Sequence, residues 1–348
     1  MTDLIENSEE TNINDEITLN SLNKTDTDKE IIKKDFIPHF FPTYRIKRNS
    51  YAIPIIIVVI ISGILAYLTY IEAGIQYDGG YVSESELGAL GGILNGLIYT
   101  AIALISSFLI VFIIKKKGIG VLMYIFGFSF ALIGFFQTWF FGEIILYLLF
   151  LNFPHLFYLF DSELIILAMV FTVLMLYQYF TSQSIKTKNF IVLYIGLLIG
   201  ASMGVLMPLW TTLSILIGIS CLDIFSVLYK RGPIKQLIDI ASNSGEQNDL
   251  SEQELKERLD SGKYEYDTTK LEIGIGDLAF YSMLTSSALV QTNNIIVMIL
   301  TAFAIIIGTG ITISGLKRNR ILPGLPLSIF LGICTMLLSW YVISTFLI

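Results

Sequence analysis

The sequence predicts an all-α, polytopic membrane protein with nine transmembrane helices, its N-terminus in the cytoplasm and its C-terminus outside. Three observations support this fold class. Of the 348 residues, 54% are hydrophobic and only 15% are charged, whereas soluble domains carry about 25% charged residues. Apolar stretches of about 20 residues, the length that crosses the hydrocarbon core of a bilayer, recur along the chain. The positively charged residues, Lys and Arg, lie only in every second connection between these apolar stretches. A soluble globular enzyme, a disordered chain and a disulfide scaffold are therefore excluded.

The chain is expected to hold a polar tail and two membrane domains joined by a polar loop. Ten acidic residues lie in the first 35 positions, and such a segment buries too little apolar surface to offset the entropy of ordering. The expected parts are a disordered cytoplasmic tail (1–44), a membrane domain with helices 1–6 and a cytoplasmic extension (45–241), a polar cytoplasmic loop (242–272), and a membrane domain with helices 7–9 (273–348).

Nine apolar segments account for the predicted helices. Because lipid offers no hydrogen bonds to the backbone, each of them must be helical. They cover residues 52–71, 90–114, 119–141, 164–180, 189–207, 211–229, 273–290, 295–315 and 324–346. A tenth stretch, 142–160, is almost as apolar, but Asn152, Pro154 and His155 interrupt it.

The distribution of charge predicts the orientation. All 22 Lys and Arg residues lie on the side of the membrane that holds the N-terminus, when the connections are numbered alternately. The other side carries acidic residues alone, such as Glu84, Glu86 and Asp161. The positive-inside rule then places the N-terminus in the cytoplasm. If 142–160 also crossed the membrane, the twelve later cations would face outward. We therefore expect that stretch to be interfacial or re-entrant.

Small residues repeat every four positions in two of the predicted helices. They are Gly196, Gly200 and Gly204 in the fifth helix, and Gly92 and Gly96 in the second. This spacing lets helices approach closely in a membrane, and we interpret it as helix packing.

Two aspartates, Asp223 and Asp277, lie at bilayer depth in the sixth and seventh predicted helices. Each costs roughly 2.5–3.5 kcal/mol on insertion scales, so a pair of them requires an explanation. Asp223 precedes Lys230 by seven residues. Asp277 follows Lys270 by seven residues. At ~1.5 Å per residue, both are expected about 10 Å inside the cytoplasmic boundary, where each is the other's obvious partner.

Two carboxyl groups at close range cannot both ionise cheaply, so the pair holds one proton over a wide pH range. The ionised member can act as general base towards water, while the protonated member acts as general acid towards a carbonyl. Aspartic proteases use this arrangement. No Ser or Cys nucleophile with a nearby base is visible, and this chemistry needs none.

Two further signals lie at the same depth as the aspartates. Gly274 and Gly276 precede Asp277 and allow close backbone approach. The ninth segment begins with Pro323, Gly324, Leu325 and Pro326. Because proline resists a helix interior, we expect this run to be extended or kinked. Irregular backbone at membrane depth persists only inside protein or beside a wet cavity. The sequence therefore predicts one cavity on the cytoplasmic side.

These motifs resemble those of the presenilin-type intramembrane aspartyl proteases, the family that includes presenilins and signal peptide peptidases. Residues 274–277, Gly-Ile-Gly-Asp, match the family's Gly-x-Gly-Asp motif, and residues 323–326 resemble its Pro-Ala-Leu-Pro motif. The stretches 222–241 and 277–282 also look presenilin-like. Two positions depart from the family pattern: Leu222 stands where Tyr is usual, and Gly324 where Ala is usual.

The resemblance implies a membrane endopeptidase that cleaves single-pass transmembrane helices. It implies that Asp223 and Asp277 are the catalytic pair, and that the glycine and proline motifs shape the site. The orientation predicted from charge is similar to that of presenilins, whereas signal peptide peptidases are inverted. No cofactor or metal is implied. Accessory subunits, which presenilins require, are not indicated by any residue of this chain.

The segment before the glycines is a candidate substrate-binding strand. It consists of Lys270, Leu271, Glu272 and Ile273. An unwound substrate could add to its edge through backbone hydrogen bonds. In presenilins the preceding loop is cleaved by the protein itself at an apolar part. Residues 243–272 are polar, so we do not expect self-cleavage here.

Two other interpretations of the aspartates stay open. A transporter or cation/proton exchanger could use them as a carrier site, and an inverted repeat, which is not visible, would favour it. A scaffold with an inactive pair is the third possibility. Cys221 and Cys334 lie in apolar segments, so no disulfide or metal set is indicated. No nucleic-acid or phosphate motif is present, and the expected partners are membrane lipid and transmembrane substrates.

Overall fold

In the computed structural model, the described residues are 30–32, 42–75, 79–118, 120–182, 184–229, 232, 236, 264–266, 270–316 and 324–346. The chain divides into two units, Met1–Phe36 with Gly245–Thr269, and Ile37–Ser244 with Lys270–Ile348. In the first unit, β1 (Glu30–Ile32) pairs in parallel with β3 (Tyr264–Tyr266). Most of the predicted tail and loop lies outside the described residues, so its disorder and the expected lack of self-cleavage stay predictions.

The second unit is built from helices. They are α2 (Ala52–Tyr67), α3 (Glu84–Leu87), α4 (Ala89–Lys117), α5 (Val121–Leu149), α6 (Pro154–Thr181), α7 (Ile185–Leu206), α8 (Leu209–Leu228), α11 (Ile275–Thr292), α12 (Ile295–Leu316) and α13 (Leu325–Phe346). The 3-10 turn η1 (Arg48–Ser50) precedes α2, and the π-helix η2 (Leu68–Glu72) continues it. Within the described chain, eight helical stretches are long and apolar enough to cross a membrane. The predicted all-α, multi-pass class is confirmed.

Helix α11 corresponds to the seventh predicted segment but is not one of these eight stretches. Its buried residues include Ser282, Thr285, Ser286 and Ser287. α11 contacts α2, α7, α8, α12 and α13, so these polar residues face protein and not lipid. A helix enclosed by other helices need not be apolar on any face, which is why its hydropathy is low. Whether there are eight or nine spans therefore depends on α11.

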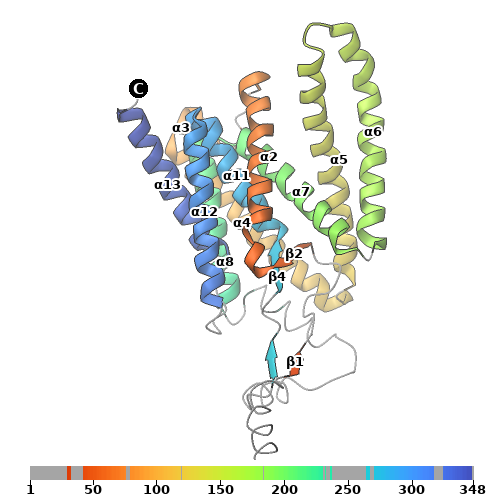
Figure 1. Ribbon diagram of the computed structural model, residues 1–348, viewed down its shortest axis with the longest axis vertical. Helices are drawn as coiled ribbons and strands as arrows, with labels where there is room; N and C mark the ends of the chain where they lie inside the picture. Colours follow the sequence, from red (N-terminus) through yellow and green to blue (C-terminus); the bar gives the residue numbers. More distant parts are fainter. Residues whose placement is uncertain are drawn as a thin grey trace, which may run out of the picture. The chain divides into compact units, whose positions relative to one another are not determined.

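The prediction that 142–160 forms a separate interfacial or re-entrant segment is wrong. α5 continues to Leu149, and α6 already begins at Pro154. The reason is that proline is well tolerated in the first turn of a helix, where its missing N–H has no partner to lose. The rings of Phe150 and Phe160 stack across the turn with their centroids 5.4 Å apart. The stretch thus lengthens two antiparallel helices, which lie side by side in Figure 1.

The glycine repeats lie where neighbouring helices pack closely against α11 and α8, the helices that carry the aspartates. A Cβ atom on Gly200 of α7 would overlap Ser282 Cβ and Ala279 O of α11. A Cβ on Gly96 of α4 would overlap Ser214 Cβ of α8. In lipid, close van der Waals packing of this kind drives helix association, because the hydrophobic effect does not. α11 therefore packs tightly against α7, and α8 packs tightly against α4.

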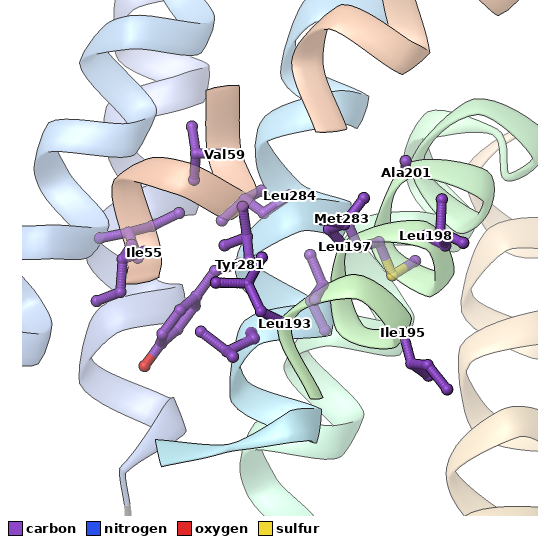
Figure 2. Close-up of a cluster of buried hydrophobic side chains, with 14 of the residues drawn as sticks. Ile55, Val59, Leu193, Ile195, Leu197, Leu198, Ala201, Tyr281, Met283 and Leu284 are labelled. Carbon is purple, nitrogen blue, oxygen red and sulfur yellow. The ribbon is translucent and has the colours of Figure 1, made fainter. Parts of the chain in front are cut away.

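Side chains of α2, α7 and α11 form the core around these contacts, as Figure 2 shows. Ile55 of α2, Leu197 of α7 and Leu284 of α11 are each 4% exposed or less. Tyr281 is also buried in this cluster, at 1% exposure, and its hydroxyl oxygen points away from the aliphatic groups in Figure 2. The core thus holds α11 through aliphatic side chains, and the Tyr281 hydroxyl points away from this contact.

Candidate active site

Asp277 lies in the first turn of α11, three residues after the N-cap residue Gly274. At this position an acidic side chain can reach back to the N-cap backbone, as in a capping box. The Asp277 side chain is turned back in this way, because a Cβ atom on Gly274 would lie 3.7 Å from Asp277 Oδ2. A carboxylate here also lies at the positive end of the helix dipole. The local sequence therefore fixes the direction of the Asp277 side chain.

Asp223 lies in the last two turns of α8, which ends at Leu228. Its Oδ2 accepts a hydrogen bond of 3.3 Å from the backbone N–H of Leu325, the first residue of α13. The Asp223 side chain is half-buried. The start of α13 thus presents a backbone donor to this carboxyl group.

Asp277 and Asp223 both lie beside the proline motif, at its consecutive residues Gly324 and Leu325. A Cβ atom on Gly324 would lie 3.7 Å from Asp277 Oδ2, and the next residue, Leu325, donates to Asp223. The two carboxyl groups are close enough for their charges to interact. Among the described residues, no ion pair with either carboxyl group is found, and Arg45 pairs with Glu272 instead.

The proline motif is more helical than expected. Gly324 forms a bend, but Leu325 and Pro326 already belong to the first turn of α13, so the expectation of an extended or kinked run is wrong for these two. Proline causes no break there, because the N–H groups of a first turn have no partner within the helix. Pro323 lies outside the described residues.

The glycines of the site differ from the packing glycines of α7 and α4. A Cβ atom on Gly274 or Gly276 would meet no atom closer than 3.7 Å, outside their nearest neighbours. The same holds for Gly324, so crowding does not enforce the departure from the family's alanine. A Cβ atom at these glycines would therefore make ordinary contacts, with the Asp277 side chain at Gly274 and Gly324 and with Phe280 at Gly276, and not clash with a neighbouring helix.

The strand predicted at 270–273 is present as β4 (Lys270–Gly274), but one of its edges is already occupied. It pairs antiparallel with β2 (Thr43–Lys47), with Arg45 opposite Glu272. Arg45 Nε lies 3.1 Å from Glu272 Oε1, and Thr43 Oγ1 donates to Glu272 Oε2 at 2.9 Å. β2 begins before residue 45, so the predicted tail boundary cuts through it. In Figure 1 this pair of strands lies at the lower end of α2 and α11.

The outer edge of β2 is closed by the side chain of Asn189 in α7. Its Oδ1 accepts from the Arg45 N–H at 2.8 Å, and its Nδ2 donates to the Arg45 carbonyl at 2.7 Å. Paired residues of an antiparallel ladder alternate between bonded and non-bonded pairs. Because the Arg45 backbone faces Asn189, the backbone N–H and C=O of Glu272 point away from β2. A further strand could join only at that edge of β4.

The comparisons with known proteins decide the family. The family model described as Presenilin matches residues 51–250 and 244–347. The chain belongs to the presenilin family. It is 34% identical to presenilin-B of Dictyostelium discoideum over 143 residues, which are 40% of this chain and 27% of that protein. It is 25% identical to a presenilin-like protein of Arabidopsis thaliana over an alignment of 330 positions, which covers 74% of this chain and 80% of that relative. The first of these matches thus spans about a quarter of its relative.

The presenilin fold of this chain includes site features that the sequence did not reveal. Asn189 was not a candidate, because its partner Arg45 is 144 residues away. Tyr281, Thr309 and Ser328 form a hydroxyl cluster near the aspartates. The sequence contained one indication of this cluster, because Tyr281 lies one helical turn after Asp277. In the described ranges, no three His, Cys, Asp or Glu side chains gather as metal ligands.

Proposed function

We propose that this presenilin family member is an intramembrane aspartic endopeptidase that hydrolyses peptide bonds within single-pass transmembrane helices. The observation that carries the proposal is the meeting of Asp223 and Asp277 at the start of α13. Two carboxyl groups that share one proton supply both the base and the acid that amide hydrolysis needs.

The proposed reaction requires no covalent intermediate. One carboxylate removes a proton from a water molecule, whose oxygen then attacks the scissile carbonyl. The protonated partner donates its proton to the carbonyl oxygen, which gives a neutral tetrahedral diol. The carboxyl group that took the proton from water then gives it to the amide nitrogen, the other carboxylate takes a hydroxyl proton from the diol, and the C–N bond breaks to release an amine and a carboxylic acid. The Leu325 N–H donates to the Asp223 carboxyl group, and the Asp277 carboxyl group lies beside Gly274 and Gly324 at the start of α11 and α13. Such preorganisation keeps the acid and the base in place during the proton transfers.

The proposed substrate site combines an extended edge with a lateral opening. The free edge of β4 offers the N–H and C=O of Glu272 to an unwound substrate strand. A groove of about 580 Å³ between α4 and α8 includes Cys221 and Leu222, which precede Asp223. Gly274 and Gly324 both lie beside the Asp277 carboxyl group and carry no side chain, so a substrate backbone can approach closely there.

The proposed topology has nine spans, the eight long apolar helices together with α11, and an N-terminus in the cytoplasm. The support is the cation distribution, because every Lys and Arg then faces the cytoplasm. In that orientation the ends of α8, α11 and α13 that carry the aspartates and the proline motif lie near the cytoplasmic surface.

The test uses the full chain in liposomes with a synthetic transmembrane peptide as substrate. Asp223→Asn and Asp277→Asn should each abolish cleavage, because a shared proton needs both carboxyl groups. Asp161→Asn in α6 is the matched control and should cleave like the wild type. A peptide isostere that carries a hydroxyl group in place of the scissile carbonyl should inhibit, since it resembles the diol.

Cleavage that survives in either variant would contradict the proposal. So would proton-coupled cation flux that depends on Asp223 and Asp277 in the absence of proteolysis, which would favour the exchanger.

A further inference from the structure

Three hydroxyl groups from three helices meet in the interior of the bundle. Thr309 Oγ1 of α12 lies 3.0 Å from Ser328 Oγ of α13 and donates to the hydroxyl oxygen of Tyr281 at 3.3 Å. The Tyr281 hydroxyl donates to Ser328 Oγ at 3.3 Å. The exposed fractions of Tyr281, Thr309 and Ser328 are 1%, 7% and 0%. We call these three side chains the hydroxyl triangle.

The triangle differs from other buried hydroxyls on the same helices. Thr301 of α12 donates to Val297 O of its own helix, and Thr285 of α11 donates to carbonyls of its own helix. Such bonds satisfy the hydroxyl without linking helices. Thr309 Oγ1 also donates to Ile305 O of its own helix at 2.9 Å, but unlike Thr301 and Thr285 it also has the hydroxyls of two other helices within hydrogen-bond distance. The Tyr281 hydroxyl is too far from its own backbone for this, and the partners that it has are the two hydroxyls of α12 and α13. Because a buried hydroxyl is costly without a partner, the triangle favours one relative position of the three helices.

The triangle lies one helical turn from the aspartate pair. Tyr281 follows Asp277 by four residues on α11, and Ser328 follows Gly324 by four on α13. Residues four apart share a helix face, so Tyr281 and Ser328 each lie one turn from a residue of the site on the same helix. Figure 2 shows the Tyr281 ring among core side chains with its oxygen directed away from them.

The backbones of α12 and α13 approach closely at the same place. A Cβ atom on Gly308, the residue before Thr309, would lie 2.6 Å from Ser328 Cα. Ser328 Oγ also lies 3.5 Å from the Gly324 carbonyl. The first turn of α13, which contacts both aspartates, is therefore linked to α11 and α12 through Ser328.

We infer that Tyr281, Thr309 and Ser328 are positioning residues, which hold the start of α13 in register with the aspartate pair. This inference rests on the proposed function. The hydroxyls touch no reacting atom. They fix where Gly324 and Leu325 stand, and thereby the distance between the carboxyl groups. A misplacement of about 1 Å can cost a rate factor of about 100.

The test exchanges one hydroxyl without changing the shape of the side chain. Thr309→Val removes the hydroxyl, Thr309→Ser retains it, and Thr301→Val is the matched control on the same helix. We expect Thr309→Val to lower kcat for the transmembrane peptide at least about tenfold, with KM and the thermal midpoint close to those of Thr301→Val. Thr309→Ser should recover most of kcat. A general packing defect would not be rescued by the hydroxyl.

A second measurement reports position without relying on catalysis. With Cys221 and Cys334 replaced by serine, the pair Asp277→Cys and Gly324→Cys should form a disulfide readily under mild oxidation. Adding Thr309→Val should slow that reaction, whereas adding Thr301→Val should not. Equal disulfide rates, equal loss of kcat in both valine variants, or no recovery with Thr309→Ser would each overturn the inference. Failure of the proposed function is distinguishable, because it would leave the wild type inactive while the disulfide rates still differ.

Discussion

Glu272 serves β4 in two separate ways. Its side chain joins β2 through Arg45 and Thr43, whereas its backbone N–H and C=O point to the other edge of the strand. The flanking residues Leu271 and Ile273 have the opposite arrangement, because their backbone groups face β2 in the alternating ladder. A substitution can therefore separate the integrity of this strand pair from its capacity to accept a third strand.

Proline at position 272 should abolish cleavage while the fold persists. It removes the N–H that an added substrate strand would bind, and proline is tolerated where that N–H faces away from the ladder. Glu272→Ala, which loses the side chain but keeps the N–H, should retain most of the activity. The measurement is the cleavage rate of the transmembrane peptide, with the thermal midpoint checked in parallel.

Ile273→Pro provides the contrasting case, because its N–H belongs to the pairing with β2. It should lower the thermal midpoint as well as the rate. If Glu272→Pro cleaves as fast as Glu272→Ala, no substrate strand is added at this edge.

At the scale of helices, both aspartates are carried by elements that glycines hold in place. Gly200 contacts α11 near Ala279 and Ser282, while Gly96 contacts α8 near Ser214. The close approach is made by backbones and Cβ atoms, which do not adjust their positions as side-chain ends do. Packing against α7 and α4 thus sets the positions of α11 and α8 through contacts of backbone and Cβ atoms.

Gly200→Ala should destabilise the protein by about 1–3 kcal/mol, the usual range for overpacking a tight contact. The added Cβ would overlap the Ala279 carbonyl oxygen and Ser282 Cβ, so α11 must shift and cleavage should slow with it. The matched control is Gly134→Ala in α5, where the new Cβ would meet the flexible Met175 Cε at 2.8 Å. Thermal unfolding in detergent compares the two. A Gly200→Ala protein as stable as the control would show that α7 and α11 are not tightly packed.

The eight long apolar helices were predictable because each one carries its own signal in its hydropathy. Pro154 misled the sequence interpretation, since the same residue either breaks a helix or begins one, depending on which neighbouring turn forms. β2 gave no signal, because its five residues become a strand only by pairing with β4, more than 200 residues away. Asp277 was predictable from its motif. Thr309 was not, since a single threonine in an apolar segment usually bonds its own helix.

At the scale of the whole chain, polar side chains are buried inside the helix bundle and apolar side chains lie on its outside. α11, the helix with the most enclosed position, carries Asp277 and a row of buried serines and threonines. α4, α5 and α6 expose most of their apolar side chains, as expected for helices that contact lipid. The cations are confined to one set of connections. This arrangement keeps Asp277 and the buried hydroxyls away from lipid, and the cations predict one orientation of the chain in the membrane.

The orientation can be tested with single cysteines in a variant that lacks Cys221 and Cys334. We expect Glu86→Cys, between α2 and α4, and Leu151→Cys, in the turn between α5 and α6, to react with a membrane-impermeant maleimide on intact cells. Ser184→Cys, between α6 and α7, should react only after the membrane is opened, because Lys186 and Lys188 hold that connection in the cytoplasm. The reverse pattern would place the aspartates near the outer surface. Protection of Leu151→Cys alone would instead mean that the turn between α5 and α6 does not reach the outer surface, and the alternation on which the cation count depends would fail at that point.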